Sequence, residues 1–82
     1  MYKNKSKDGQ LNICGSKIRN LRKSLPRKTS QRMLADMLQL EGIDLDKNAI
    51  QRIESGRRFV TDIELKALAR VLSTTTDSLL ND

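Results

Sequence analysis

The sequence contains no histidine and no tryptophan, and it has one residue each of cysteine, proline, phenylalanine and tyrosine. Without histidine, and with Cys14 as the only thiol, the chain lacks the usual ligands of a zinc site and the usual general base of a hydrolase. One cysteine cannot form a disulfide within the chain, and we expect Cys14 to be a small buried apolar residue. Paired carboxylates in a shared context and a glycine-rich phosphate loop are also missing. The sequence therefore predicts a protein that is not an enzyme, has no catalytic residues and carries no metal or cofactor.

Long apolar runs are absent too. None approaches the roughly 18 residues that a membrane-spanning helix needs, and the N-terminus has no apolar signal-peptide core. We therefore expect a cytoplasmic protein with no membrane partner. The scarcity of aromatic residues requires an aliphatic core, which favours packed helices over a sandwich of sheets. A length of 82 residues is enough for one domain.

Charge is present in excess and is unevenly placed. The formal net charge is +6, and nine basic residues up to position 28 stand against a single acid, Asp8. From position 61 onward, two basic residues stand against four acids. This asymmetry indicates a polyanionic partner bound on one side, although a basic protein with a charged tail would show the same count.

Residues 1–10 contain three lysines and almost no apolar residue. Such a composition cannot offset the entropy of ordering, so we expect a flexible basic arm there and a folded domain over residues 11–82. The arm could follow DNA into a groove or remain a solvated tail.

Apolar residues recur at helical spacing and predict an all-α fold of five short helices. The expected boundaries combine apolar periodicity with caps, prolines and glycines. In chain order they are Cys14 to Ser24, before Pro26; Gln31 to Gly42, capped by Thr29 or Ser30; Asp46 to Gly56; a helix opening with the capping box Thr61-x-x-Glu64; and a last helix capped by Thr74 or Thr75. A wide apolar face predicts a central second helix, and two leucines of the last helix are expected to close the core. These residues are Met33, Leu34, Met37, Leu38 and Leu40, and Leu79 and Leu80.

The third expected helix has two distinct faces when its residues are advanced by about 100° each. Its polar arc contains no acid and comprises Lys47, Gln51, Ser55, Asn48 and Arg52, opposite Ala49, Ile50 and Ile53. Asn and Gln pair with the edge of adenine, and Arg and Lys with that of guanine. The helix dipole disfavours a cation in the first turn, so an external partner would explain Lys47. The arc therefore indicates either base readout or an ordinary solvated face.

Residues 31–58 read QRMLADMLQLEGIDLDKNAIQRIESGRR. With Ser30 they follow the pattern S-Q-x-x-L-A-x-x-L, a turn, and x-I-x-x-I-E-x-G-x-R. This pattern resembles the phage-repressor helix-turn-helix family (Cro-type, or xenobiotic-response-element). The flanking stretches KIRNLRKSL and LKALARVLSTTTDSLL resemble the first and the last two helices of that family, so the likeness covers about residues 13–80.

The resemblance implies a repressor-type five-helix fold and sequence-specific binding of double-stranded DNA by a bacterial or phage transcriptional regulator, a repressor. It places the third helix, about residues 46–55, in the major groove. The base-reading residues would be Lys47, Asn48, Gln51 and Arg52. The DNA backbone contacts would be Gln31, Ser30, Arg57, Arg58 and Lys17. The resemblance also implies a structural partner for Glu54 on the first helix, either Arg19 or Arg22.

The sequence departs from the family pattern between the second and third helices. Ala35 and Ile50 lie 15 positions apart, which is longer than the pattern by more than one helical turn. Either the second helix is longer or the turn is a true loop, and Ile43 and Leu45 are expected to pin such a loop to the core.

A single module of this size binds DNA weakly, so we expect a homodimer on paired half-sites about 34 Å apart. Leu79, Leu80 and the surface of the fourth helix are the candidates for its interface. Two alternatives use the same fold. One is the antitoxin of a toxin–antitoxin pair, and the other is a protein-interaction module that does not read DNA. A toxin or an anti-repressor is therefore a possible protein partner.

Overall fold

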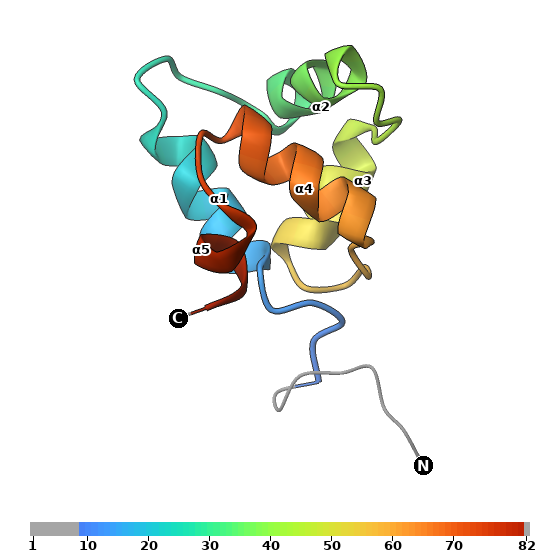
Figure 1. Cartoon of the computed structure of the whole chain (residues 1–82). Coiled ribbons are helices and arrows are strands. Elements are labelled where there is room, and N and C mark those ends of the chain that lie inside the picture. Colours follow the sequence, from blue (N-terminus) through green and yellow to red (C-terminus); the bar gives the residue numbers. More distant parts are fainter. Residues whose placement is uncertain (1–8, 82) are drawn as a thin grey trace.

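The computed structural model describes residues 9–81, which form five helices and no strand (Figure 1). The helices are α1 (Gly15–Ser24), α2 (Gln31–Leu40), α3 (Lys47–Glu54), α4 (Asp62–Val71) and α5 (Thr76–Leu80). The predicted all-α, five-helix fold is confirmed, with boundaries close to those expected. Most of the predicted basic arm, residues 1–8, lies outside the described residues, and the arm remains a prediction.

Four of the five helices begin with a side-chain cap. The hydroxyl of Ser30 accepts the N–H of Met33, and a carboxylate oxygen of Asp46 accepts that of Ala49. The α4 helix opens with the complete capping box, in which Thr61 and Glu64 each bond the other's backbone. Thr75 caps α5. The alternatives that the sequence left open are thus settled in favour of Ser30 and Thr75, and caps of this kind each stabilise a helix by about 1 kcal/mol.

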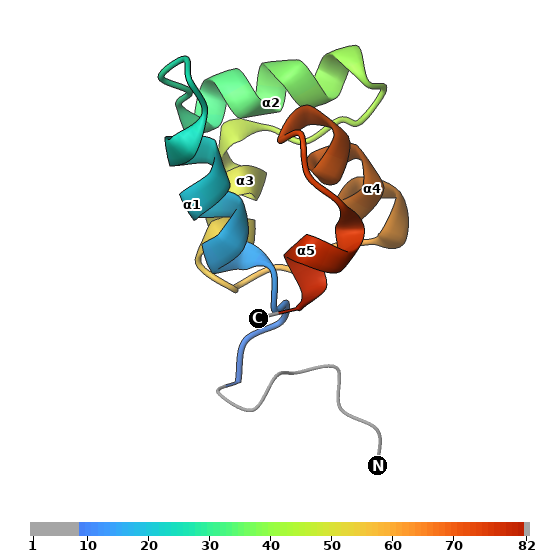
Figure 2. The same ribbon diagram turned by 60° about the vertical axis from the view of Figure 1, so that its left-hand side comes forward.

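The core is aliphatic, as the composition requires. Its fully buried side chains come from every helix: Ile18, Leu34, Leu38, Ile50, Ile53, Leu68 and Leu79. Cys14 is only 2% exposed, and its burial raises the pKa of its thiol, which confirms the prediction of a small buried residue. The α2 helix packs against both α3 and α4 and lies across the ends of α1 and α4, so it lies at one end of the bundle and not at the centre that its wide apolar face predicted (Figure 2).

Two leucines expected in the core lie outside it. Leu40 is 88% exposed, because it lies two residues beyond the buried Leu38 and therefore about 200° further around α2. Leu80 is 43% exposed, because α5 is short and packs through its neighbour Leu79 alone. The expectation that both would fill the core was wrong.

The long connection between α2 and α3 is a true loop, residues 41–46. Gly42 has a φ of 84°, and the N–H groups of Gly42 and Ile43 donate to the carbonyls of Gln39 and Leu38. This is a Schellman ending of α2, which requires the left-handed conformation that glycine adopts without strain. Leu45 is 2% exposed and Ile43 packs against the core, so the prediction that the two pin the loop is confirmed.

Candidate nucleic-acid interface

The two faces predicted for α3 are present in the structure. Ile50 and Ile53 are fully buried and Ala49 is half-buried. On the opposite side all four proposed base-reading side chains are exposed, and none has a hydrogen-bond or ion-pair partner within residues 9–81: Lys47, Asn48, Gln51 and Arg52. The helix is therefore fixed through one face and leaves the other free to bind.

The carboxylate of Glu54 also joins α3 to two other helices. Arg22 of α1 binds it with two nitrogens, at 2.7 and 3.0 Å, and the amide nitrogen of Gln31 of α2 donates to it at 3.0 Å. Arg22 also donates to the carbonyl of Thr29, at 2.9 Å. The side chains of Arg22 and Glu54 are 10% and 4% exposed. Of the two partners that the sequence allowed, the structure selects Arg22, and the resulting network joins α1, α2 and α3.

Gln31, a proposed backbone contact, is thus partly committed to the fold. It lines a groove between α1 and α3, together with Arg19, Lys23, Gln51 and Ser55. Its amide oxygen has no partner within the described residues, and Gln31 shares this groove with Gln51, one of the proposed base-reading residues. One group can therefore orient α3 and also accept a hydrogen bond from a ligand.

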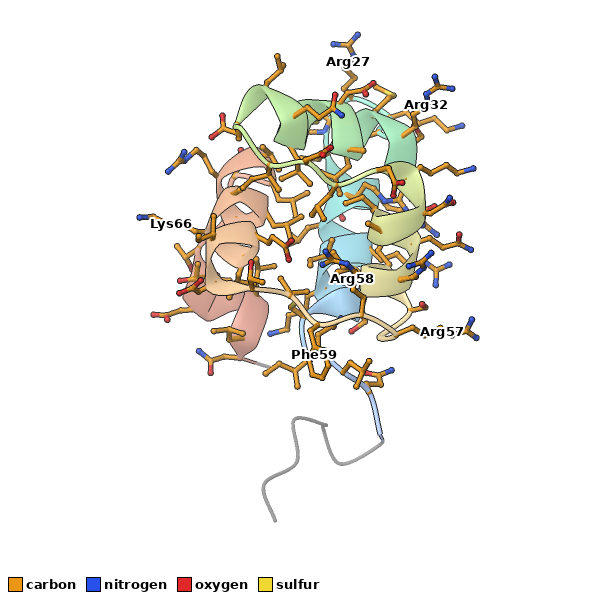
Figure 3. All side chains as sticks on the ribbon, turned by 90° about the vertical axis from the view of Figure 1, so that its right-hand side faces the viewer. Arg27, Arg32, Arg57, Arg58, Phe59 and Lys66 are labelled. Atoms are coloured by element: carbon orange, nitrogen blue, oxygen red, sulfur yellow. The ribbon has the colours of Figure 1, made fainter. Side chains whose placement is uncertain are left out.

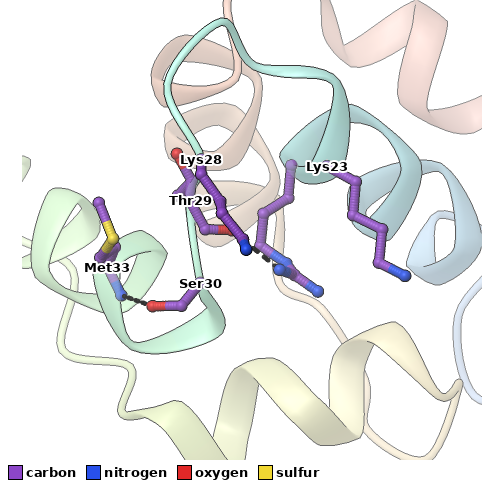
Figure 4. A pocket seen from close by; sticks show the side chains of 6 residues that line it. Lys23, Lys28, Thr29, Ser30 and Met33 are labelled. Atoms are coloured by element: carbon purple, nitrogen blue, oxygen red, sulfur yellow. Dashed lines mark hydrogen bonds between the residues drawn. The ribbon is translucent and has the colours of Figure 1, made fainter.

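Ser30 lies at the N-terminus of α2, where its hydroxyl caps the helix. Lys23 and Lys28 line the pocket at this helix end, which has a volume of about 590 Å³ (Figure 4). The first turn of α2 contains no acid, so the partial positive charge of the helix end adds to that of the two lysines. Sequence reasoning missed these lysines. The excess of basic residues up to position 28 indicated a cationic surface. It did not show which of these residues would line the pocket at the start of α2.

Arg57 and Arg58 follow α3 but differ in their surroundings. The Arg57 side chain is exposed, has no hydrogen-bond or ion-pair partner within residues 9–81 and projects outward below α3 (Figure 3). Arg58 binds Glu64 through two nitrogens, at 3.0 and 3.2 Å. Partial burial of Glu64 would by itself raise its pKa, but the bonds from Arg58 and Thr61 outweigh burial, and the pKa lies below its usual value. Much of the charge of Arg58 is therefore used in holding the start of α4.

Lys17 lies away from the other proposed contacts. Its ammonium group donates to the carbonyl of Ser78 in α5, at 2.9 Å. The structure therefore brings Lys17 to α5 and not to the exposed side of α3.

The exposed side of α3 and its flanks form a surface that we name the α3 face: Lys47, Asn48, Gln51, Arg52, Arg57 and Arg32. Arg32 and Arg57 project on the side of the molecule where α3 lies, one above the helix and one below it, whereas Lys66 of α4 projects at the opposite edge (Figure 3). Between α2 and the start of α3, the face is hollowed by a groove of about 340 Å³. Such a face has the charge and hydrogen-bonding groups that a nucleic acid requires.

Other kinds of site find no support in the part of the chain that the structure describes. No three His, Cys, Asp or Glu side chains there lie close enough to hold a metal ion. Across residues 9–81, every helix is too short or too polar to cross a membrane.

Comparison with known proteins agrees with the geometry. The family model for the Cro/C1-type helix-turn-helix matches residues 18–79, which include all five helices except the ends of the first and last. No curated protein and no solved structure gives a significant match. The match covers more than half of the chain and includes the helix pair α2–α3 with its long loop. The chain therefore belongs to the Cro/C1-type helix-turn-helix family of DNA-binding regulators.

Proposed function

We propose that this regulator is a repressor that reads operator DNA with α3 in the major groove. The observation that carries the proposal is the free polar arc of α3, opposite the buried Ile50 and Ile53 and next to the Glu54 network that joins α3 to α1 and α2. Asn48 and Gln51 suit adenine, and Lys47 and Arg52 suit guanine. Bound operator would block transcription by occupancy, in the cytoplasm, where such DNA lies.

Phosphate contacts would fix the protein on the duplex. We assign them to the N-terminus of α2 with Ser30, Lys23 and Lys28, to the free oxygen of Gln31, and to Arg57. Arg58 would contribute through the nitrogen that Glu64 does not bind. Lys17, held at α5, would act through long-range attraction and not through contact.

Selection of bound sequences from a random pool of duplex DNA tests the proposal directly. We expect enrichment of one motif, arranged as two half-sites about 34 Å apart. A pool that stays random would overturn sequence-specific reading and favour the protein-interaction module.

Replacing Arg57 with alanine should weaken binding to every duplex to a similar extent. The slope of log K against log salt should fall by about 0.9, because one phosphate contact and its released counterion are lost. Lys66→Ala, which removes a charge from the opposite edge, is the matched control and should keep the slope. Titrations at several salt concentrations measure both, and an equal change in the two variants would contradict a local contact.

A homodimer would use the surface next to the end of α3. Leu79 is fully buried and cannot contribute, whereas Ile13 is 55%, Phe59 50% and Leu80 43% exposed. The Asn12 amide donates to the Arg58 carbonyl at 2.7 Å. Ile13 follows Asn12 and Phe59 follows Arg58 in the chain, so Ile13 and Phe59 lie near each other. Exposed apolar residues gathered beside a binding face are typical of an interface.

Phe59→Asp should therefore raise the dimer dissociation constant about tenfold or more, because a charge would replace an apolar anchor. Sedimentation over a range of protein concentrations measures it. Leu40→Asp, at an even more exposed apolar position on the far end of α2, should leave association unchanged. Dimers of wild-type strength in the Phe59 variant would move the interface elsewhere.

One further observation favours a protein partner, as an antitoxin or an anti-repressor target would have. A groove of about 530 Å³ lies between α2 and the α1–α2 loop and is lined by Leu25, Pro26, Met33 and Met37. Methionines adapt to varied partners. Copurification of a neighbouring gene product with wild-type protein, and its loss in Met37→Lys, would support this second function.

A further inference from the structure

Arg57 lies in the loop after α3, and the backbone on both sides of it is bound. The carbonyl of Gly56 accepts the N–H of Leu11 at 2.8 Å. The carbonyl of Arg58 accepts the side-chain amide of Asn12 at 2.7 Å. The side chain of Arg57 itself is exposed and projects outward (Figure 3). A cationic side chain that points into solvent is thus attached to a fastened stretch of backbone.

Asn12 connects this loop to two helices. Its amide nitrogen also donates to the carbonyl of Ile53 at 3.1 Å, in the last turn of α3. Its amide oxygen accepts the N–H of Gly15 at 2.8 Å, at the start of α1. Helix ends leave such carbonyl and N–H groups without partners in the helix itself. Two acceptors and one donor match a primary amide, whereas a carboxylate has no hydrogen to donate and a hydroxyl has only one.

Two glycines let the residues before α1 approach the end of α3 closely. A side chain at Gly15 would overlap the carbonyl of Ile53. Gly56 has a φ of 78°, which glycine adopts without strain, and the side chain of Gln10 lies over its open side. Asn12 precedes the family match, which begins at residue 18, so this arrangement is a feature of the chain beyond that match.

We propose that Asn12 is a positioning residue for DNA binding, which holds the loop after α3 so that Arg57 meets the phosphate backbone. This inference rests on the proposed function, because it assumes that Arg57 contacts DNA. A loop that became ordered only on binding would lose conformational entropy at that step and weaken the complex. Because Asn12 orders this loop when the protein folds, the contact between Arg57 and a phosphate forms without that loss.

The first test is a double-mutant cycle of Asn12→Ala and Arg57→Ala. Binding is measured at several salt concentrations on a short duplex of arbitrary sequence, because phosphate contacts carry no sequence information. Asn12→Ala alone should reduce the slope of log K against log salt by up to about 0.9, although it removes no charge. In the Arg57→Ala background it should leave the slope unchanged. The fold-loss from Arg57→Ala should be smaller by a factor of about two or more in the Asn12→Ala background.

Thr75→Ala is the matched control for lost stability. It removes the cap of α5, on the opposite side of the molecule from α3 (Figure 3), and should keep the slope. If Asn12→Ala kept the slope of this control, or if the two losses simply multiplied, Asn12 would serve the fold alone and the inference would be overturned. An unchanged slope in Arg57→Ala itself would refute the Arg57 contact of the proposed function, and the inference with it.

Asn12→Ser provides the second test, which stands even if the alanine variant does not fold. Its hydroxyl can still accept the N–H of Gly15, but with one hydrogen it cannot bond the carbonyls of both Ile53 and Arg58. The N–H of Arg57 should therefore exchange with solvent about fivefold faster or more in the free protein, as expected for weakened hydrogen bonding of its loop. Hydrogen exchange followed by NMR measures it. Equal acceleration at Arg57 and throughout α4 would indicate general destabilisation and overturn the positioning role.

Discussion

Replacing Glu54 with glutamine should lower the midpoint of thermal unfolding by roughly 12 °C or more. The change removes the charge that pairs with Arg22 in a site where both side chains are almost fully buried. Removing one partner of a buried pair leaves an uncompensated charge and costs about 3–5 kcal/mol, and glutamine, which keeps one acceptor, belongs near the lower value. In a domain of this size 1 kcal/mol shifts the midpoint by about 4–8 °C.

Glu41→Gln is the matched control for this prediction. It makes the same chemical change in the ion pair between Glu41 and Arg70, whose side chains are 28% and 61% exposed. Exposed pairs contribute about 0–1 kcal/mol, so the midpoint should shift by a few degrees at most. Calorimetry of both variants at one pH measures the difference. Equal shifts would mean that the network around Glu54 does not hold α3.

The second large effect is expected on DNA recognition. Gln51→Ala and Arg52→Ala should each reduce the preference for operator over random duplex by about 1–3 kcal/mol, because each removes side-chain bonds to base edges. Both side chains are exposed and have no partner within residues 9–81, so neither change should affect folding. Competition binding with operator and random DNA measures the preference.

Lys66→Ala controls for the charge lost in the Arg52 variant and should retain the full preference, since Lys66 lies at the opposite edge (Figure 3). If both α3 variants discriminated as well as wild type, α3 would not be the reader. The long loop before α3 would then be the segment to examine next.

Local features of the fold were predictable from sequence because they depend on neighbouring residues. The capping box at Thr61 and the Schellman glycines at positions 42 and 56 involve groups within about six residues of each other. Leu40 shows the limit of this reasoning. It extends an apolar stripe, yet a leucine is buried only if another element covers it, and none does.

Side chains that act over long distances in the sequence could not be assigned in the same way. Arg19 and Arg22 lie on one helix and are chemically alike, and only the packing of α1 on α3 brings Arg22 to Glu54. The Asn12 side chain donates to the carbonyls of Ile53 and Arg58, which lie 41 and 46 positions further along the chain. No local sequence pattern predicts these hydrogen bonds. The family resemblance predicted Lys17 and Arg58 as DNA backbone contacts, but their partners, Ser78 and Glu64, depend on how α5 and α4 fold back.

The loop of residues 41–46 is fastened at several points along its length. Gly42 closes α2, Leu45 enters the core, and Glu41 reaches Arg70 of α4 at 2.7 Å. Added length in a connection is costly to the fold only as far as it adds unconstrained conformations. Here the extra residues make contacts of their own, so the length of the connection can change without changing the position of α3. Evolution or an engineer could therefore vary this loop to create new contacts beside α3 while that helix keeps its place.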